Sequence, residues 1–307
     1  MRRDVEILKR PLRSIRSWPP LNHLLTAGGR AALQTGGWSA GPLPRLLPRA
    51  GLVESPLPDG KVLRMWSRAD DDVTPQVYWN GWAGHEPETS TLFYERARSA
   101  RTTIDIGAHV GYFALLAGHA NSAGDVYAFE PHPLVYERLT RNTALNDLGN
   151  VSCQQLAVGN KGGVARFYYA RGGINSSSSL SQRFMESIVV NSRLESSEVH
   201  VVSLDDFVDE RHIADVDLVK IDTETTEGDV FEGMVRTLRR DEPIVFCEVL
   251  QSSAGGVIER ILDDFAYRYF LLTDKGPMRR AHVLPEPPWR NFYLVPESRC
   301  GNGEFDQ

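Results

Sequence analysis

Short apolar segments alternate with longer amphipathic segments from about residue 100 onward. The β-branched run at 102–107 and the apolar run at 125–130 predict strands, and the segments 112–121 and 133–147 predict helices. Further runs continue the alternation at 151–158, 164–170, 199–207, 216–222, 230–240, 243–249, 256–265, 268–273 and 291–297. Strands that alternate with helices are typical of a parallel sheet with helices on both faces. The sequence therefore predicts a doubly wound α/β domain over residues 99–298.

The last two apolar runs, 268–273 and 291–297, are joined by a segment with no helical pattern. A connection without a helix suits neighbouring antiparallel strands, because parallel strands need a longer crossover. We therefore expect an antiparallel hairpin at the C-terminal edge of the sheet, followed by a short tail over residues 299–307.

The N-terminal third of the chain lacks this alternation. Residues 1–50 are rich in Arg, Pro and Gly, which interrupt any period and predict an arm of short helices and turns. Residues 51–98 predict a small subdomain, with strands at 61–67 and 75–82 and a helix at 88–98. The first sixteen residues hold six Arg or Lys and two acids. Such an arm suits weak contact with an anionic membrane surface, and a solvated arm is the simpler interpretation.

The composition narrows the class of protein. The chain of 307 residues has 40 acidic and 34 basic residues and a net charge of −6, which argues against a nucleic-acid binder. Its three cysteines are far apart and match no metal spacing, as in proteins of a reducing cytoplasm. No apolar run approaches the roughly 18 residues of a membrane helix, and the N-terminus lacks the apolar core of a secretory signal. We therefore expect a cytoplasmic enzyme or binding protein.

The segment TTIDIGAHVGYF, residues 102–113, predicts a ligand-binding turn. In a doubly wound sheet, ligands bind beyond the carboxyl ends of the strands. Gly107 ends the first strand and would let the backbone approach a ligand, while Gly111 stands at the mouth of the next helix. Asp105 precedes the turn, and Glu130 ends the second strand. A carboxylate at that position suits the two hydroxyls of a ribose.

The glycine spacing distinguishes between two nucleoside cofactors. Nicotinamide dinucleotides require the pattern G-x-G-x-x-G, and this chain has His109 where the second glycine would stand. A carboxylate beside the turn disfavours a pyrophosphate and favours a cation. S-Adenosylmethionine carries a sulfonium, an ammonium and a ribose without phosphate, so it fits better. A nicotinamide-dependent oxidoreductase remains the alternative enzyme, and a non-catalytic cofactor-binding module is the alternative outside enzymes.

Several segments together resemble the FkbM family of S-adenosylmethionine-dependent O-methyltransferases. They are IDIGAHVGYFALLAG, VYAFEPHPLVYERLTRN, LAVGNKGGVARFYYA, VSLDDF, VDLVKIDTETTEGDVFEGM and PIVFCEV, within about residues 100–272. The resemblance implies a Rossmann-like class I sheet of seven strands with a reversed last strand. It also implies methylation of a hydroxyl on a small molecule, a sugar or glycan, or a natural product.

The expected cofactor site follows from the strand ends and from this resemblance. It comprises Asp105, Gly107, Ala108, His109, Gly111, Glu130, Pro131 and Asp222. Two positions depart from the family pattern. After KID the family has V-E-G-x-E, whereas this chain has Thr225 in place of the glycine, and His109 stands where the family often has Asn. The lost glycine puts the backbone path of this segment in question.

Transfer of a methyl group to a hydroxyl needs an acceptor for the hydroxyl proton. Asp222 and Glu248 each close a predicted inner strand, and Glu224 follows two residues after Asp222. Such carboxylates can share a proton, hold a substrate hydroxyl or bind a divalent cation, and no metal ligand is assigned. His109 and His132 are alternative bases on the cofactor side. Glu227 is better explained as a carboxylate at the positive end of a helix.

Overall fold

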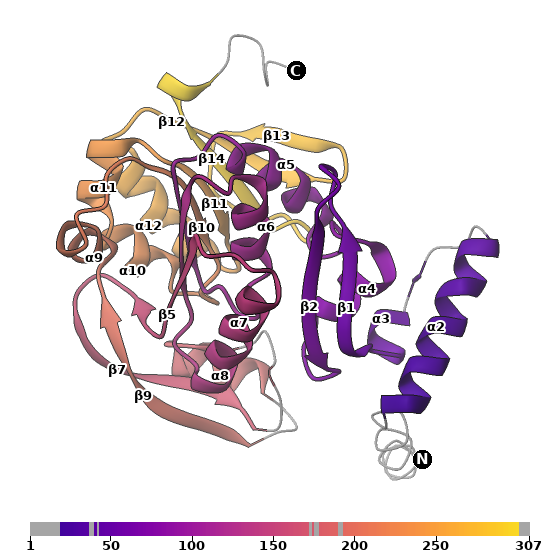
Figure 1. Ribbon diagram of the computed structural model, residues 1–307. Helices are drawn as coiled ribbons and strands as arrows, with labels where there is room; N and C mark the ends of the chain where they lie inside the picture. Colours follow the sequence, from indigo (N-terminus) through magenta and orange to yellow (C-terminus); the bar gives the residue numbers. More distant parts are fainter. Residues whose placement is uncertain are drawn as a thin grey trace. The chain divides into compact units, whose positions relative to one another are not determined.

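The computed structural model describes residues 19–36, 40–41, 43–171, 174, 178–189 and 193–300 (Figure 1). The chain divides into two compact units, one of residues 1–87 with 173–176, and one of the remaining residues. The basic arm expected at residues 1–16 lies outside the described residues, as does most of the expected C-terminal tail. No helix in the described ranges combines the length and the apolar character needed to cross a bilayer.

The described part of the first unit contains a β-hairpin and three helices. Its elements are α2 (Pro19–Gly36), α3 (Leu43–Leu46), β1 (Ala50–Pro56), β2 (Val62–Arg68) and α4 (Val73–Asn80). β1 and β2 pair antiparallel, so the strand predicted at 61–67 has a partner that the sequence pattern did not indicate. α2 is a single helix of 18 residues, where shorter helices were predicted. Asn22 anchors α2, because its side chain bonds both the Pro48 carbonyl and the Ala50 amide.

The strand predicted at residues 75–82 is wrong, because most of this segment is α4. Its aromatic and β-branched residues favour a strand by propensity. The helix starts here because the Asp71 carboxylate accepts the Thr74 amide at 2.6 Å, and because Pro75 falls in the first turn, where no amide donor is required. Val77, Tyr78 and Trp79 are then buried.

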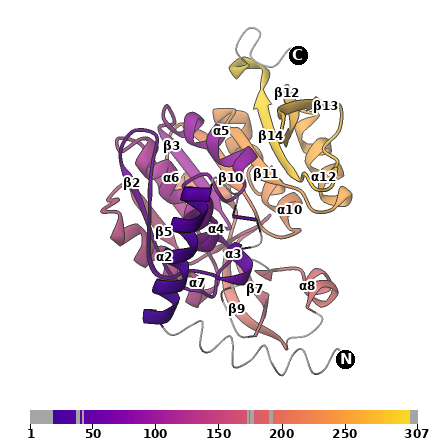
Figure 2. The same cartoon turned by 90° about the vertical axis from the view of Figure 1, so that its right-hand side faces the viewer.

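The second unit is built on an eight-stranded sheet. The strands are β3 (Thr102–Ile106), β4 (Asp125–Phe129), β5 (Val151–Gln154), β10 (Val216–Ile221), β11 (Ile244–Glu248), β12 (Tyr267–Thr273), β13 (Gly276–Arg280) and β14 (Asn291–Pro296). Their order is β13-β12-β14-β11-β10-β3-β4-β5 (Figure 2). From β11 to β5 all pairs are parallel, as predicted. β14 runs antiparallel to both β11 and β12, which confirms the reversed last strand.

β13 is an eighth strand that the sequence pattern did not indicate. It pairs antiparallel with β12 at the edge of the sheet. Its sequence, GPMRR, has neither an apolar run nor a clear alternation. An edge strand needs little burial, and this is why a pattern of apolar runs does not reveal it.

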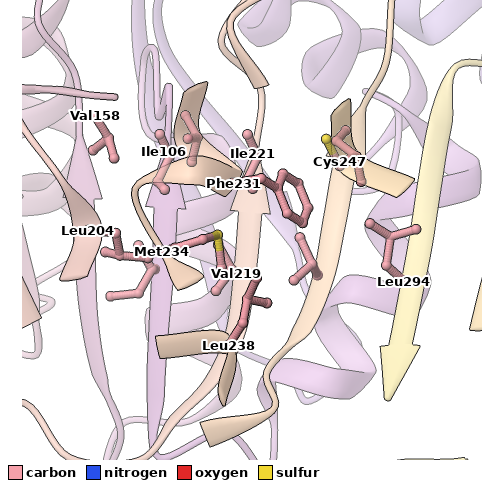
Figure 3. Close-up of a cluster of buried hydrophobic side chains, with 14 of the residues drawn as sticks. Ile106, Val158, Leu204, Val219, Ile221, Phe231, Met234, Leu238, Cys247 and Leu294 are labelled. Atoms are coloured by element: carbon pink, nitrogen blue, oxygen red, sulfur yellow. The ribbon is translucent and has the colours of Figure 1, made fainter. Parts of the chain in front are cut away.

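Helices cover both faces of this sheet. α5 (Pro87–Ala97), α6 (Tyr112–Ala120) and α7 (Pro133–Leu145) lie on one face, and α9 (Leu204–Glu210), α10 (Glu227–Glu232), α11 (Val235–Asp241) and α12 (Ser252–Leu262) lie on the other (Figure 1). On the second face, Ile106, Ile221 and Cys247 from three neighbouring strands pack against Phe231 and Met234 (Figure 3). The parallel strands are buried on both sides, and this explains why apolar and polar residues do not alternate strictly along them.

A second, four-stranded sheet lies within the same unit. It has the order β6-β9-β7-β8, with β6 (Ala157–Val158), β7 (Gly163–Ala170), β8 (Ser178–Ser179) and β9 (Leu194–Val202), and α8 (Gln182–Ile188) follows β8. The apolar run at 151–158 is thus divided between the two sheets. Phe167, Val199 and Ala157 form a small core of their own in this sheet.

Candidate active site

The strand register aligns the carboxyl ends of four neighbouring parallel strands. Phe129 pairs with Ile106, Ile106 with Ile221, and Ile221 with Cys247. The residues that follow these positions are therefore level with one another: Glu130, Gly107, Asp222 and Glu248. This edge lies between β4 and β11 and brings together four residues that the sequence places at separate strand ends.

The turn after β3 has an unusual backbone at alternate residues. Gly107, His109 and Gly111 have φ values of +81°, +51° and +94°. The amides of Gly107 and Ala108 both donate to the Phe129 carbonyl, at 3.0 and 2.9 Å. The turn is therefore fixed to the end of β4, and Gly111 begins α6 in the left-handed region that glycine tolerates.

The structure explains the glycine at position 107 by packing within the protein, whereas the sequence suggested the approach of a ligand. A Cβ atom at Gly107 would collide with the backbone carbonyl of Asp222 on the neighbouring strand. Gly111 is restricted by a side chain instead, because a Cβ there would lie 2.7 Å from Leu139 Cδ1 on α7. The two glycines let the turn and α6 pack tightly against β10 and α7.

Glu130 fastens this turn from the β4 side. Its carboxylate is buried and accepts the amides of His109 at 3.0 Å and of His132 at 2.8 Å. Burial raises the pKa of Glu130 to about 7, the two amide hydrogen bonds oppose the rise, and the charge of Asp105 adds to it. Each carboxylate oxygen has a second lone pair, so the group can still accept a ribose hydroxyl.

We expect Glu130→Ala to lower both stability and cofactor affinity, because one carboxylate holds the turn and would also accept the ribose hydroxyls of a bound cofactor. The expected loss of S-adenosylhomocysteine binding is about 1.5–3 kcal/mol, the range for hydrogen bonds to a charged group. Asn142→Ala is the control, since the Asn142 side chain holds the same turn through the Val110 carbonyl without offering a carboxylate. Calorimetry and thermal unfolding compare the two variants, and equal losses of affinity would reduce Glu130 to a structural residue.

An acidic segment follows β10. Asp222 is partly exposed, and its Oδ2 lies 3.4 Å from Nζ of the buried Lys220. Glu227 is fully buried at the first residue of α10, where its Oε1 accepts the Thr225 amide at 2.9 Å and the Thr223 hydroxyl at 3.1 Å. Its Oε2 is also buried and accepts no hydrogen bond from the described residues. Glu227 thus holds the segment together, consistent with the structural role favoured by the sequence.

The carboxyl groups of Glu224 and Glu227 both have raised pKa values, to different extents. Burial, together with the charges of Asp222 and Glu227, raises the pKa of Glu224 to about 8, while the charges of Arg290 and Lys220 oppose the rise. Burial likewise raises the pKa of Glu227 to about 7, opposed by its hydrogen bonds. Near neutral pH, Glu224 therefore holds a proton for most of the time and can donate a hydrogen bond.

The substituted position of the family pattern keeps the backbone of a glycine. Glu224 and Thr225 have φ values of +55° and +86°. A β-branched residue in this region is strained, and the buried Thr225 hydroxyl finds no hydrogen-bond partner among the described residues. Ser179 on β8 fixes the peptide by donating to the Glu224 carbonyl at 2.7 Å. The backbone path put in question by the missing glycine is therefore retained at a cost in strain.

Thr225→Gly should raise the free energy of unfolding by about 1 kcal/mol, because glycine removes the strain and the unpaired hydroxyl. Thr226→Gly is the matched control, since Thr226 has an ordinary φ of −111° and glycine there should destabilise the chain. Urea unfolding of both variants without ligand measures the difference. A destabilised Thr225→Gly protein would contradict the assignment of strain.

The two histidines occupy different settings. His109 is half-buried in the turn after β3. His132 is the N-cap of α7, accepts the Leu134 amide through Nδ1, and packs edge-on against the ring of Tyr169 with centroids 4.3 Å apart. Burial lowers the pKa of His132, which leaves it neutral near pH 7. Pro131, buried between Glu130 and His132, completes the β4 end of the site.

Two further features bear on the chemistry. Within the described residues, no three His, Cys, Asp or Glu are grouped closely enough to hold a metal ion. A hollow of about 440 Å³ lies at the opposite edge of the sheet, lined by residues that include Asp209, Asp215 and Arg240. These side chains are engaged in ion pairs, such as Arg101 with Asp215 at 2.7 Å. The hollow is far from the glycine turn and does not belong to the site.

The sequence profile of the methyltransferase FkbM domain matches residues 105–269. The chain belongs to the FkbM methyltransferase family. Among curated relatives, the 31-O-demethyl-FK506 methyltransferase FkbM of Streptomyces tacrolimicus is 27% identical over 45% of this chain and 60% of its own length. The methyltransferase sdnD of Sordaria araneosa is 36% identical over 22% of this chain and 26% of its own length. The chain thus spans only part of these relatives.

Solved structures give more distant similarities. The FkbM methyltransferase of Methylobacillus flagellatus has a TM-score of 0.41 at 14% identity, over 64% of this chain and 43% of that one. The O-methyltransferase TomG of Streptomyces achromogenes, solved with S-adenosylmethionine, has a TM-score of 0.40 at 14% identity. The similarity covers 68% of this chain and 78% of TomG. The strand order and the reversed β14 agree with the class I sheet that the family resemblance implies.

Proposed function

We propose that this FkbM-family methyltransferase transfers the methyl group of S-adenosylmethionine to a hydroxyl of a small molecule, a glycan or a natural product. The observation that supports it is the level row of Glu130, the Gly107 turn, Asp222 and Glu248 at one sheet edge. A relative whose name specifies a 31-O-demethyl acceptor supports oxygen as the acceptor atom.

The residues of this edge fit the cofactor better than they fit a dinucleotide. The turn has acids on both sides, at Asp105 and Glu130, and such a setting favours a cationic ligand and repels a pyrophosphate. Glu130 and the turn backbone would hold the nucleoside of the cofactor. Asp105 and Asp222 would face the positive charge of the cofactor. When bound, S-adenosylmethionine supplies an electrophilic methyl group on a sulfonium.

The protein contributes position and a proton acceptor. An aligned hydroxyl at near-attack distance needs little further activation, because alignment alone lowers the barrier by several kcal/mol. Asp222 takes the hydroxyl proton onto its carboxylate as the oxygen forms its new bond to carbon. Glu224, protonated near neutral pH, donates a hydrogen bond that orients the acceptor or Asp222. Glu248 and His109 are the remaining proton acceptors at this edge.

Calorimetry tests the cofactor first. Micromolar binding of S-adenosylhomocysteine, with no binding of NADH or NADPH, supports the proposal, whereas the reverse result supports an oxidoreductase. Incubation with methyl-labelled S-adenosylmethionine and extract of the source cell then identifies the acceptor. The Asp222→Asn protein is the control for methylation by other enzymes in the extract. Cofactor binding without any labelled product would favour a non-catalytic binding module.

A further inference from the structure

Lys220 is a fully buried lysine in the middle of the parallel sheet. It occupies β10, where all six residues are buried, and its side chain has no exposed surface. The register pairs it with Asp105 on β3 and with Phe246 on β11. Paired residues of neighbouring strands point to the same face, so Lys220 and Asp105 lie side by side beneath α5 and α6.

The surroundings of the ammonium are mostly aromatic. Its Nζ lies 4.8 Å from the centroid of the Phe113 ring on α6. Phe93 on α5 contacts Phe113 and Phe246 edge-on, with centroid separations of 5.0 and 5.5 Å. A cation that is removed from water in this way is costly unless a carboxylate lies close to it. The cation–π contact recovers only a part of that cost.

Lys220 reaches the carboxylate of Asp222. Asp222 comes two residues after Lys220. Side chains two residues apart along a strand point to the same side, so both lie on the same face of the sheet. Their closest atoms, Nζ and Oδ2, are 3.4 Å apart. Asp222 is partly exposed at the sheet edge while Lys220 approaches it from inside. The ammonium therefore contacts the carboxylate from the side opposite to the solvent.

We propose that Lys220 is a positioning residue for methyl transfer: its buried ammonium orients the Asp222 carboxylate and keeps it ionised to receive the acceptor proton. The inference rests on the proposed function. The proton passes from the hydroxyl oxygen to Asp222, and Lys220 remains an ammonium throughout. It also offsets the repulsion between the Asp105 and Asp222 carboxylates at one edge of the sheet.

Several titratable groups lie around Lys220, and the pKa of one of them, Glu224, reports the charge of the lysine. Asp105 pairs with Lys220 from β3, Asp222 and Glu224 follow the end of its own strand, and Glu227 begins α10 on the other face of the sheet. Cys247 and Glu248 belong to β11, and Arg290 also acts on Glu224. Lys220 lowers the pKa of Glu224, which Asp222 and Glu227 raise. Loss of the ammonium should therefore raise the pKa of Glu224 further.

The first test needs no acceptor. Carbon-13 NMR of glutamate-labelled protein follows the Glu224 carboxyl through a pH titration, and the Glu224→Gln protein assigns its resonance. In Lys220→Met the midpoint should move upward by about one pH unit, a tenfold change in proton affinity. Phe113→Leu is the control, because it removes the ring contact and keeps the charge. An unchanged midpoint in Lys220→Met overturns the inference, and Lys220→Gln replaces this variant if it does not fold.

The second test uses turnover with the acceptor identified from the extract. Lys220→Met should lower kcat about 10- to 150-fold, the range for a lost hydrogen bond to a charged group, while KM changes little and Lys220→Arg recovers part of the rate. In the Asp222→Asn background the same substitution should have almost no further effect. Additive losses overturn the inference. A wild-type protein that neither binds cofactor nor methylates rejects the proposed function instead.

Discussion

Asp222→Asn should lower kcat by about 10²–10⁴ and leave the affinity for S-adenosylhomocysteine within a few-fold. This range is typical of the loss of a general base. The side chain keeps its size. The backbone N–H of Asp222 donates to the Ile106 carbonyl at 2.9 Å and is unaffected by the substitution, so the strand end should not move. The variant can still form a hydrogen bond to the acceptor, but it cannot take a proton as a carboxylate does.

A matched control for this variant lies at the other end of the same strand. Asp215 precedes β10 and pairs with Arg101 at the opposite sheet edge, so Asp215→Asn changes the same chemical group without touching the site. Its kcat should equal that of the wild type. If the affinity of Asp222→Asn collapses together with its rate, Asp222 is a cofactor ligand and the base is Glu224, Glu248 or His109. If turnover survives within a few-fold, positioning alone drives the reaction.

The sheet could be predicted because its strands are buried on both faces. The strands TTIDI and IVFCE are buried at nearly every position without alternation, as expected of strands in a covered parallel sheet. Two of the departures from the prediction, at α4 and β13, arose where burial does not decide the structure. α4 is set by the Asp71 carboxylate and by Pro75, and β13 is a polar edge strand. Local hydrogen bonds and edge pairing are not visible in an apolar pattern.

The candidate site was partly predictable for a geometric reason. The carboxyl ends of parallel strands meet at one edge, so acids at those ends can be expected to gather there. The strand register decides which of these residues are in contact, and the register could not be read from the apolar pattern. Glu130 binds two backbone amides of the turn and of α7, and Gly107 is required by the Asp222 carbonyl. Lys220 was overlooked, although a lysine near the end of a predicted inner strand was its visible sign.

Thr225 shows how a departure from a family pattern can leave the backbone unchanged. The surrounding bonds determine the conformation of this position: the Glu227 carboxylate holds the Thr225 amide, and Ser179 holds the preceding carbonyl. These contacts impose the left-handed conformation on threonine at an energetic cost. A missing glycine therefore does not imply a changed loop when neighbouring groups fix both ends of the peptide.

Gly107→Val should abolish measurable cofactor binding and destabilise the fold by about 2–6 kcal/mol, from backbone strain together with overpacking. The new Cβ would strike the Asp222 carbonyl and push the turn away from β10, and valine does not tolerate the φ of +81° at this residue. Both effects act where β3 and β10 meet. The row formed by Glu130, the turn and Asp222 would therefore lose its alignment.

Gly276→Val separates the clash from the backbone strain. Gly276 has a φ of +94°, and a Cβ added there would meet no atom of the other described residues within 4 Å, so its substitution adds strain without a collision. This control should lose stability by about 1–3 kcal/mol and keep the wild-type affinity for S-adenosylhomocysteine. Urea unfolding and calorimetry on both variants give the comparison. A folded Gly107→Val protein with unchanged affinity would remove the turn from the cofactor site, because no cofactor seated on this backbone could tolerate its displacement.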